Sequence, residues 1–259
     1  MLVDSHCHLN YPGVREDQAG VIDRARAAGV GTMLGISTRA SEWSEVIALA
    51  AAHPDIWASV GIHPHEADAH PDIDAARLIE AADHPKVIAI GETGLDYFYD
   101  HSDRDRQRAS FRAHISAARA TSLPIIVHTR DAEEDTAAIL GEEMEQGTFT
   151  GVIHCFTASQ AFAEQVLALG FYISLSGILT FKNARDLQAT AATIPADRLL
   201  IETDSPFLAP VPMRGRPCEP AFVAQTAAFL AKLRGQGVET IAADTTNNFF
   251  NLFSKAQRP

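Results

Sequence analysis

The chain has 259 residues, of which 46% are hydrophobic and 21% are charged, and its formal net charge is −12. This length suits a single α/β barrel with a large core, and the acidic balance excludes a protein that attracts nucleic acid by its overall charge. The sequence shows neither an apolar stretch of transmembrane length nor a signal-peptide pattern, so we expect no membrane association. Three cysteines cannot all pair with one another, which favours free thiols and a reducing cytoplasm.

Eight short apolar runs are predicted as β-strands. In chain order they are Leu2–Asp4, Gly31–Ile36, Ile56–Ile62, Val87–Glu92, Pro124–His128, Gly151–His154, Phe171–Leu175 and Leu199–Asp204. Most of them are near-continuous runs of Val, Ile and Leu, which is typical of parallel strands covered on both faces.

The segments between these runs carry apolar residues at three- and four-residue spacing, which predicts helices. Examples are Gln18–Ala28, Ser41–His53, Asp105–Ala120, Ser159–Leu169 and Arg185–Ile194, followed later by Phe222–Arg234 and Thr240–Phe253. Ser41 and Ser159 suit helix N-caps, whereas Gly29 and Gly170 suit C-terminal caps. Pro206–Pro220 is predicted as a long loop after the eighth strand.

Repeated alternation of strand and helix predicts an α/β fold, the (β/α)₈ TIM barrel, and we expect residues 1–259 to form one domain. The alternative is a doubly wound open sheet. Its glycine-rich turn, Gly-x-Gly-x-x-Gly, does not follow the first strand.

The segment Asp4-Ser5-His6-Cys7-His8-Leu9 is the most informative motif. Alternate residues of a strand share a face, so Asp4, His6 and His8 point one way and Cys7 points the other. Two imidazoles one pleat apart can hold a divalent cation, although they do not select the metal. A lone His-x-His is a weak signal, because two ordinary polar residues near an exposed terminus give the same pattern.

Further candidate ligands stand at the predicted strand ends. The full set is His6, His8, Glu92, His128, His154 and Asp204. In a barrel the carboxyl ends of all strands converge at one mouth, so these residues become neighbours. Four histidines and two carboxylates suffice for two cations if one carboxylate bridges, and two cations roughly 3.5–4 Å apart form a clamp for phosphoryl transfer.

Eight motifs are highly specific in combination. They are Asp4-Ser-His-Cys-His-Leu, Gly61-Ile-His-Pro-His, Gly91-Glu-Thr-Gly-Leu-Asp-Tyr, Val127-His-Thr-Arg, His154-Cys-Phe-Thr, Ser176-Gly-Ile-Leu-Thr-Phe-Lys-Asn, Glu202-Thr-Asp-Ser-Pro-Phe-Leu-Ala-Pro and Asn247-Asn-Phe-Phe. With them the chain resembles the TatD-type metal-dependent deoxyribonucleases, a branch of the amidohydrolase-like barrels, over nearly its whole length. The resemblance implies a barrel with two divalent ions (Mg, Mn or Zn) that hydrolyses phosphodiester bonds in DNA, commonly as a 3′-to-5′ exonuclease.

The resemblance also implies how the candidate ligands divide between two ions. One ion takes His6, His8, Glu92 and Asp204, and the other takes Glu92, His128 and His154. Asp204 is the candidate to accept the proton of the attacking water, because a carboxylate that binds the metal lies within reach of that water. Glu92 then serves as the bridging carboxylate.

Other residues are expected around this centre. His63 is the candidate to donate a hydrogen bond to a phosphate oxygen or leaving group, and it is favoured over His65. Arg130, Asp96 and Glu202 are candidates for substrate binding. The alternatives are that Asp96 fixes the loop that presents Glu92 and that Glu202 orients a histidine or is a structural carboxylate.

Basic and aromatic residues on predicted loops are weaker candidates. Tyr97, Phe98 and Tyr99 can stack bases of a single strand or simply pack the loops. Lys182, Arg214 and Arg216 are candidate phosphate contacts on loops at the same mouth, although surface cations are usually only solvated. Arg130 stands out because it follows a candidate ligand by two residues.

Two positions depart from the family pattern. Cys218 stands where Asn is usual, close to the expected substrate side, and His114 stands in the fourth helix where Gln is common. Neither change touches a proposed ligand.

Two other functions fit the same ligand set. A two-metal amide or ester hydrolase (a deacylase) attacks carbonyls in the same way, but such enzymes often bridge their ions with a carboxylated Lys, and Glu92 occupies that strand position here. A non-catalytic metal-binding interaction module has little need for two ions with open coordination sites. We expect single-stranded DNA ends as substrate and a monomer by default.

Overall fold

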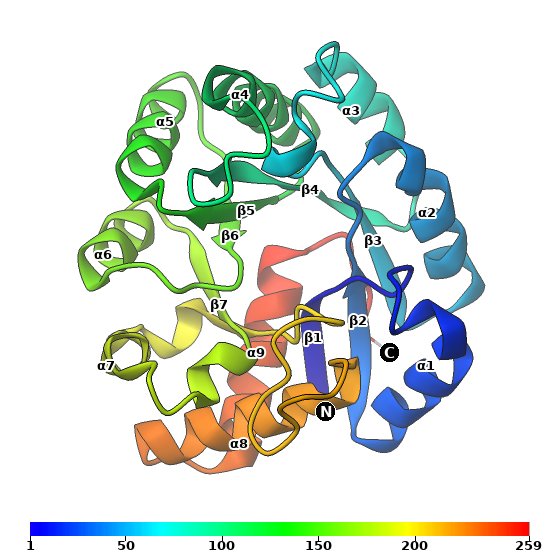
Figure 1. Cartoon of the computed structure of the whole chain (residues 1–259), viewed down its shortest axis with the longest axis vertical. Helices are drawn as coiled ribbons and strands as arrows, with labels where there is room; N and C mark the ends of the chain where they lie inside the picture. Colours follow the sequence, from blue (N-terminus) through cyan, green and yellow to red (C-terminus); the bar gives the residue numbers. More distant parts are fainter. Residues whose placement is uncertain (259) are drawn as a thin grey trace.

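The computed structural model describes residues 1–258 and shows a barrel of eight strands surrounded by helices (Figure 1). The strands are β1 (Leu2–Cys7), β2 (Val30–Gly35), β3 (Ile56–Val60), β4 (Val87–Asp96), β5 (Ile125–Arg130), β6 (Gly151–Ile153), β7 (Tyr172–Leu175) and β8 (Leu199–Ile201). They follow one another around the sheet in chain order, and each consecutive pair is parallel. The predicted TIM barrel is therefore confirmed. That residues 1–259 form a single domain stays a prediction.

The helices cover the outside of the sheet. They are α1 (Gln18–Ala27), α2 (Trp43–Ala52), α3 (Ala75–Ala82), α4 (Arg104–Thr121), α5 (Glu133–Glu145), α6 (Gln160–Ala168), α7 (Arg185–Thr193), α8 (Val223–Arg234) and α9 (Val238–Leu252). In the part of the chain that is described, none of them is both long and apolar enough to cross a bilayer.

Helix ends follow the predicted capping residues in most cases. Ser159 caps α6, because its side chain accepts a hydrogen bond from the Phe162 N–H. Gly29 and Gly170 follow α1 and α6 with φ of +85° and +86°, a region that glycine enters without steric cost. The N-cap prediction for Ser41 is wrong, since a short 3₁₀ turn precedes α2 and Ser41 lies inside that turn.

Several strands end at other residues than predicted. β1 and β4 continue to Cys7 and Asp96, whereas β3 and β8 already end at Val60 and Ile201. The pairing register shifts between Asp4 and Cys7 in β1 and between Ile90 and Thr93 in β4, and both strands continue past the residues where the apolar pattern stops. Functional residues therefore lie partly within strands and partly on the loops after them.

β1 and β8 meet where the barrel closes. The His8 N–H donates to the Ser205 carbonyl at 2.8 Å, and the Asp204 N–H donates to the His6 carbonyl at 2.9 Å. These two bonds hold the end of β1 against the loop after β8. Two predicted ligands from the start of the chain are thereby fixed next to one from near its end.

The end of the barrel where the strands begin is filled by α9, which lies behind the strands in Figure 1. Phe249, Phe250 and Phe253 belong to one buried cluster with side chains from the strands, such as Val3, Leu34, Trp57, Ile88, Ile126 and Leu200. A second cluster joins the strands to the surrounding helices. Apolar packing thus fills one end of the barrel, and polar side chains gather at the other end, the mouth.

Candidate metal centre

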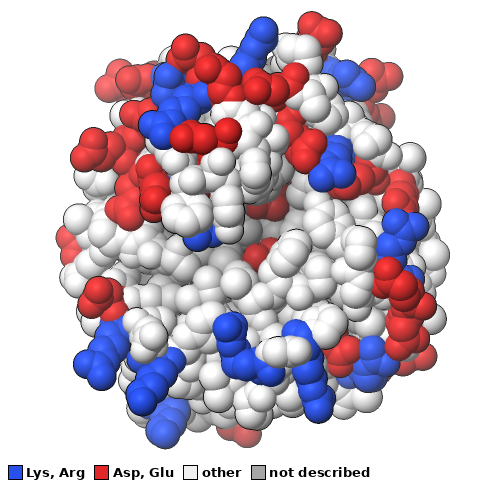
Figure 2. Space-filling view, viewed as in Figure 1, with Lys and Arg blue, Asp and Glu red and all other residues white. Residues whose placement is uncertain are grey.

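The mouth of the barrel is hollowed, and carboxylate atoms are visible at its floor in Figure 2. All residues predicted as ligands come together there, and most are buried: His6, His8, Glu92, His128, His154 and Asp204. That they bind metal stays a prediction, but their arrangement can be described in detail.

The two carboxylate oxygens of Glu92 face two different groups of histidines. Oε2 lies 3.3 Å from His6 Nε2 and 3.9 Å from His8 Nε2. Oε1 lies 2.7 Å from His154 Nε2 and 3.2 Å from His128 Nδ1. Each oxygen therefore belongs to its own set of ring nitrogens, which is the arrangement that a bridging carboxylate requires.

Asp204 completes the first group. Its Oδ1 lies 3.4 Å from His8 Nε2 and 3.6 Å from His6 Nε2. Its backbone has φ of +56°, in the left-handed region, which Asp enters more often than most residues other than glycine. Its side chain keeps 13% of its surface exposed, against 3% for Glu92, so Asp204 is the more accessible of the two carboxylates.

Buried carboxylates orient the histidines of the second group. Asp96 Oδ2 lies 3.1 Å from His128 Nε2, and Glu202 Oε1 lies 3.3 Å from His154 Nδ1. Metal-binding histidines typically donate their outer N–H to such a partner, which fixes the tautomer and leaves the other nitrogen as a ligand. In that arrangement the lone pairs of His128 Nδ1 and His154 Nε2 both point into the centre.

The residues present fit a pair of divalent cations. His128 Nδ1 and His154 Nε2 lie 3.3 Å apart and both face Glu92 Oε1, so a cation can take the place of a proton among these three atoms. On the other side, His6 Nε2 is buried without a hydrogen-bond partner among residues 1–258. A buried polar atom left unpaired costs about 1–3 kcal/mol, and a cation between these atoms removes that cost.

The charges of the centre depend on one another. Burial disfavours the ionised form of Glu92, yet His154, His63 and His6 hold its pKa well below the usual range. Burial likewise disfavours protonated His154, but Glu92 and Glu202 raise the pKa of that imidazole well above its usual range. The carboxylate is therefore ionised at neutral pH, and a proton and a metal ion compete for His154.

Asp96 links the end of β4 to two histidines. Its Oδ1 accepts hydrogen bonds from the N–H groups of Phe98 and Tyr99, and its Oδ2 is 2.9 Å from His65 Nε2 as well as close to His128. Asp96 is fully buried. This position serves the predicted role of fixing the loop after Glu92, and it leaves no exposed surface for the predicted contact with substrate.

Glu202 is also fully buried. Besides its contact with His154, its Oε1 accepts the Cys155 N–H at 2.8 Å. Of the roles predicted for Glu202, this position favours orienting a histidine, and contact with substrate stays a prediction. The predicted eighth strand included Glu202, but β8 ends at Ile201, so Glu202 lies on the loop that follows.

His63 points its Nε2 into the centre, 3.4 Å from Glu92 Oε1. Its Nδ1 accepts the His65 N–H at 3.1 Å, so the proton of the neutral ring lies on Nε2. Burial lowers the pKa of His63 well below the usual value, which keeps the ring neutral. The side chain thus offers one N–H to the centre, as its predicted role as a hydrogen-bond donor requires.

The loop after β4 separates the three predicted stacking aromatics. Phe98 and Tyr99 are 54% and 48% exposed, and the Arg130 guanidinium lies over both rings. Tyr97 is half-buried, and its hydroxyl donates to Asp135 Oδ2 at 2.6 Å. Tyr97 therefore packs the loop against α5 and is not part of the exposed aromatic surface.

The expectation that Cys218 lies close to the substrate side stays a prediction. Cys218 is fully buried, and its N–H donates to the Pro206 carbonyl at 2.9 Å. The side chain supports the base of the loop after β8 from beneath. Within residues 1–258, Cys7, Cys155 and Cys218 are all free thiols, as predicted.

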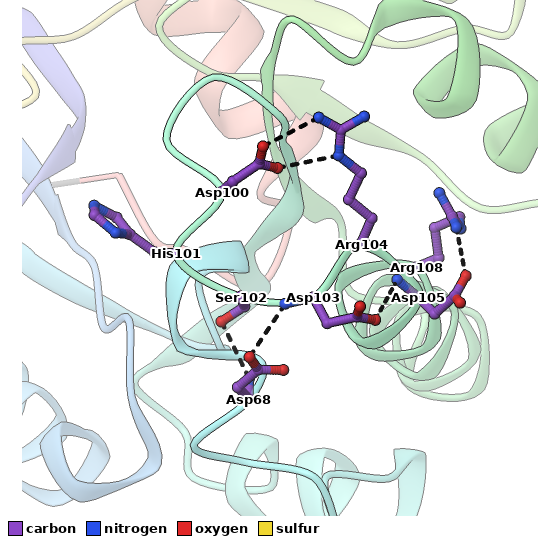
Figure 3. A pocket seen from close by; sticks show the side chains of 8 residues that line it. All are labelled: Asp68, Asp100, His101, Ser102, Asp103, Arg104, Asp105 and Arg108. Carbon is purple, nitrogen blue, oxygen red and sulfur yellow. Dashed lines mark hydrogen bonds and ion pairs between the residues drawn. The ribbon is translucent and has the colours of Figure 1, made fainter.

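A separate surface pocket of about 390 Å³ lies between the loop after β4 and α4 (Figure 3). It is lined by Asp68, Asp100, His101, Ser102, Asp103, Arg104, Asp105 and Arg108. Its carboxylates are engaged within the fold: Asp100 pairs with Arg104, and Asp103 caps α4. These contacts connect the loop that carries the exposed aromatics to α4.

Comparisons with known proteins agree with this centre. The model of the family described as TatD related DNase matches residues 3–254. The chain is 44% identical over 255 residues to the uncharacterized metal-dependent hydrolase YcfH of Escherichia coli (strain K12), covering 97% of this chain and 95% of that protein. It is 39% identical over 259 residues to a protein named 3′-5′ ssDNA/RNA exonuclease TatD from Erwinia tasmaniensis, covering 98% of this chain and all 100% of that protein.

Solved structures give the same result. The crystal structure of YJJV, a TatD homolog from Escherichia coli K12, superposes with a TM-score of 0.91 at 31% identity and covers 98% of both chains. The family match extends over nearly all of the barrel and includes every residue of the histidine and carboxylate centre. The chain therefore belongs to the TatD-related DNase family and is a metal-dependent hydrolase.

Proposed function

We propose that this protein removes nucleotides from the 3′ end of DNA, preferentially from single-stranded ends, by hydrolysis that depends on two divalent cations. The observation that carries the proposal is the division of the Glu92 carboxylate, whose oxygens face separate groups of histidines. The activity named for the Erwinia tasmaniensis relative supports the direction of cleavage and the choice of single strands.

In this proposal the ligand set divides around Glu92. One cation is held by His6, His8, Glu92 and Asp204, and the other by Glu92, His128 and His154. Four imidazoles favour zinc or manganese over magnesium, which prefers oxygen ligands. When bound, the cations make the mouth locally positive, acidify a water molecule and offset the charge that develops on phosphate oxygens.

The protein's own groups then have separate tasks. The Asp204 carboxylate, the more exposed of the two, accepts the proton of the attacking water. His63 donates its Nε2–H to a phosphate oxygen, where a fixed donor in a buried site stabilises developing charge. Arg130, exposed at the end of β5, contacts a phosphate of the substrate. Asp96 and Glu202 act through the histidines that they orient.

The preference for single-stranded ends follows from the shape of the site. The centre lies at the floor of a hollow (Figure 2), whereas a DNA duplex is stiff over a length of ~50 nm. A flexible terminal nucleotide can enter the hollow, and the middle of a duplex cannot. We propose a cytoplasmic location, which agrees with the three free thiols. We also propose that the protein acts on DNA as a monomer.

A labelled oligonucleotide tests the proposal. A single-stranded substrate with a 5′ label should give a ladder that shortens one nucleotide at a time, and chelator or a 3′-terminal phosphorothioate should stop it. Protein with Glu92→Gln, purified in the same way, controls for contaminating nucleases. Efficient cutting of covalently closed single-stranded circles would contradict entry from an end, and turnover of a chromogenic amide without any of a phosphodiester would favour the deacylase.

A further inference from the structure

Two exposed arginines at the mouth stack on aromatic rings. The Arg130 guanidinium carbon lies 4.1 Å from the ring centre of Phe98 and 4.8 Å from that of Tyr99. The Arg214 guanidinium carbon lies 3.9 Å from the ring centre of Phe181. Within residues 1–258, neither arginine forms an ion pair with a carboxylate.

Arginines elsewhere on the barrel do pair with carboxylates in this chain of 33 acidic and 21 basic residues. In α4, four of the five arginines form ion pairs with carboxylates. They are Arg104, Arg108, Arg112 and Arg119. Stacking uses the flat face of a guanidinium and leaves the N–H groups along its edges available. Apart from one long contact of 3.5 Å from Arg130 to the Tyr99 hydroxyl, those edges carry no side-chain partner among the described residues.

The two stacked arginines lie on different sides of the mouth. Arg130 ends β5, and Arg214 belongs to the loop after β8, which crosses the lower part of Figure 1. That loop is fastened to the turn after β7, because the Val211 N–H donates to Thr180 Oγ1 at 2.8 Å, next to Phe181. Each guanidinium is thus held by an aromatic ring on an anchored loop or strand end.

The surroundings of Arg214 favour an anion. In Figure 2, Lys and Arg side chains gather along the lower edge of the hollowed face, whereas Asp and Glu crowd the upper edge. Lys182 and Arg185 follow β7 in the chain, and Arg216 follows β8 as Arg214 does. In the described part of the chain they too form no ion pair. A guanidinium with a free edge matches a phosphate group, to which it can donate two parallel hydrogen bonds.

We propose that Arg130 and Arg214 form a two-point phosphate grip, which binds two phosphates of one single strand lying across the mouth. The exposed ring of Phe98 stacks against a base of that strand, a contact that tolerates any sequence. This inference rests on the proposed function and deepens it, because the recognised ligand is a chain of several nucleotides and not an isolated phosphate ester. The protein then holds a polyanion locally in spite of its net charge of −12.

Salt dependence of binding tests the grip. Metal-loaded protein is titrated into a 5′-fluorescein single-stranded oligonucleotide whose 3′-terminal linkages are phosphorothioates, and anisotropy gives the affinity over a series of salt concentrations. Each phosphate contact to a single strand contributes about 0.7 to the slope of log affinity against log salt. Arg130→Gln and Arg214→Gln should each weaken binding and flatten the slope by about 0.7, and the double variant by about 1.4.

Arg198 provides a matched control. It also stacks on an aromatic ring, with its guanidinium carbon 5.0 Å from the Tyr172 ring centre, but it lies just before β8, at the opposite end of the barrel. Arg198→Gln should bind with the affinity and slope of the wild type. Circular dichroism and the thermal midpoint of each variant show whether it is folded.

The outcomes separate the grip from the proposed function. If the wild type shortens an unprotected oligonucleotide while both mouth variants keep its affinity and slope, the grip is wrong and the exonuclease stands. If the wild type neither binds nor shortens the oligonucleotide, both are wrong. A loss of slope confined to the two mouth variants supports the grip, even for a wild type that turns over slowly.

Discussion

The Asp96 carboxylate and the His128 ring share a hydrogen bond of 3.1 Å between Oδ2 and Nε2. This contact decides which nitrogen of His128 faces the centre, because the proton on Nε2 leaves Nδ1 as the only ligand atom of the ring. Asp96 itself has no exposed surface. A buried carboxylate thus orients a predicted metal ligand.

Asp96→Asn should therefore weaken metal binding while the barrel stays folded. The amide retains an oxygen for the N–H groups of Phe98 and Tyr99 but no longer fixes the His128 tautomer, so we expect a loss of metal affinity of about 10–100-fold. Competition with a chelating dye measures that affinity. Asp100→Asn, at an exposed loop residue paired with Arg104, serves as the control and should bind like the wild type. Equal affinity in both variants would remove Asp96 from this role.

Asp204→Asn tests the proton acceptor. The substitution keeps the shape of the side chain and one oxygen that can bind metal but removes the basic carboxylate. We expect kcat to fall by ~10²–10⁴, the contribution typical of a positioned general base, with metal content mostly preserved. Steady-state kinetics and elemental analysis of the same preparation check both parts. Near-normal turnover would show that the proton goes elsewhere, with His63 the next candidate.

His114 should make the stability of the protein depend on pH below neutrality. It is fully buried in α4, where its Nε2 accepts the Ile62 N–H, and burial lowers its pKa to about 4 from an ordinary 6.5. The neutral ring is stable in the folded state, whereas the unfolded chain takes up a proton below pH 6.5. The neutral His114 ring therefore makes its full contribution to the free energy of unfolding above pH 6.5. This contribution is lost as the pH falls toward 4, and the free energy of unfolding decreases by about 3 kcal/mol at most.

His114→Gln is the variant for this measurement, since its amide oxygen can still accept the Ile62 N–H. Urea unfolding of both proteins between pH 7 and pH 4 gives the free energy of unfolding as a function of pH. The wild type should lose more stability than the variant over this interval. Parallel pH curves for the two proteins would show that His114 titrates as an ordinary exposed imidazole.

The barrel was predictable from the sequence because parallel strands buried on both faces have continuous apolar runs, and the helices between them have helical spacing. Strand ends were less predictable. Glu92 ends the apolar run of β4, but the strand continues through polar residues to Asp96, since hydrogen bonds with β5 extend beyond the apolar pattern. The local sequence of β4 does not show where its pairing with β5 ends.

The ligand candidates were identifiable for a related reason: His, Glu and Asp at the ends of apolar runs meet at the mouth of a barrel. The residues that orient them were harder to assign. Asp96 joins His65 from the turn after β3 to His128 from β5, and only the folded barrel brings these segments together. The burial of Cys218 was not predictable from its loop-like neighbours, because the base of a loop can be as buried as the core.

The bridging role of Glu92 is the central claim, and the metal content of Glu92→Ala tests it most directly. One Glu92 oxygen faces His6 and His8 and the other faces His128 and His154, so removal of the carboxylate affects both groups at once. Elemental analysis of protein purified without chelator should find two metal ions per wild-type chain and a loss at both sites in Glu92→Ala, with an unchanged circular dichroism spectrum. Two metal ions retained per chain in Glu92→Ala would contradict the bridge.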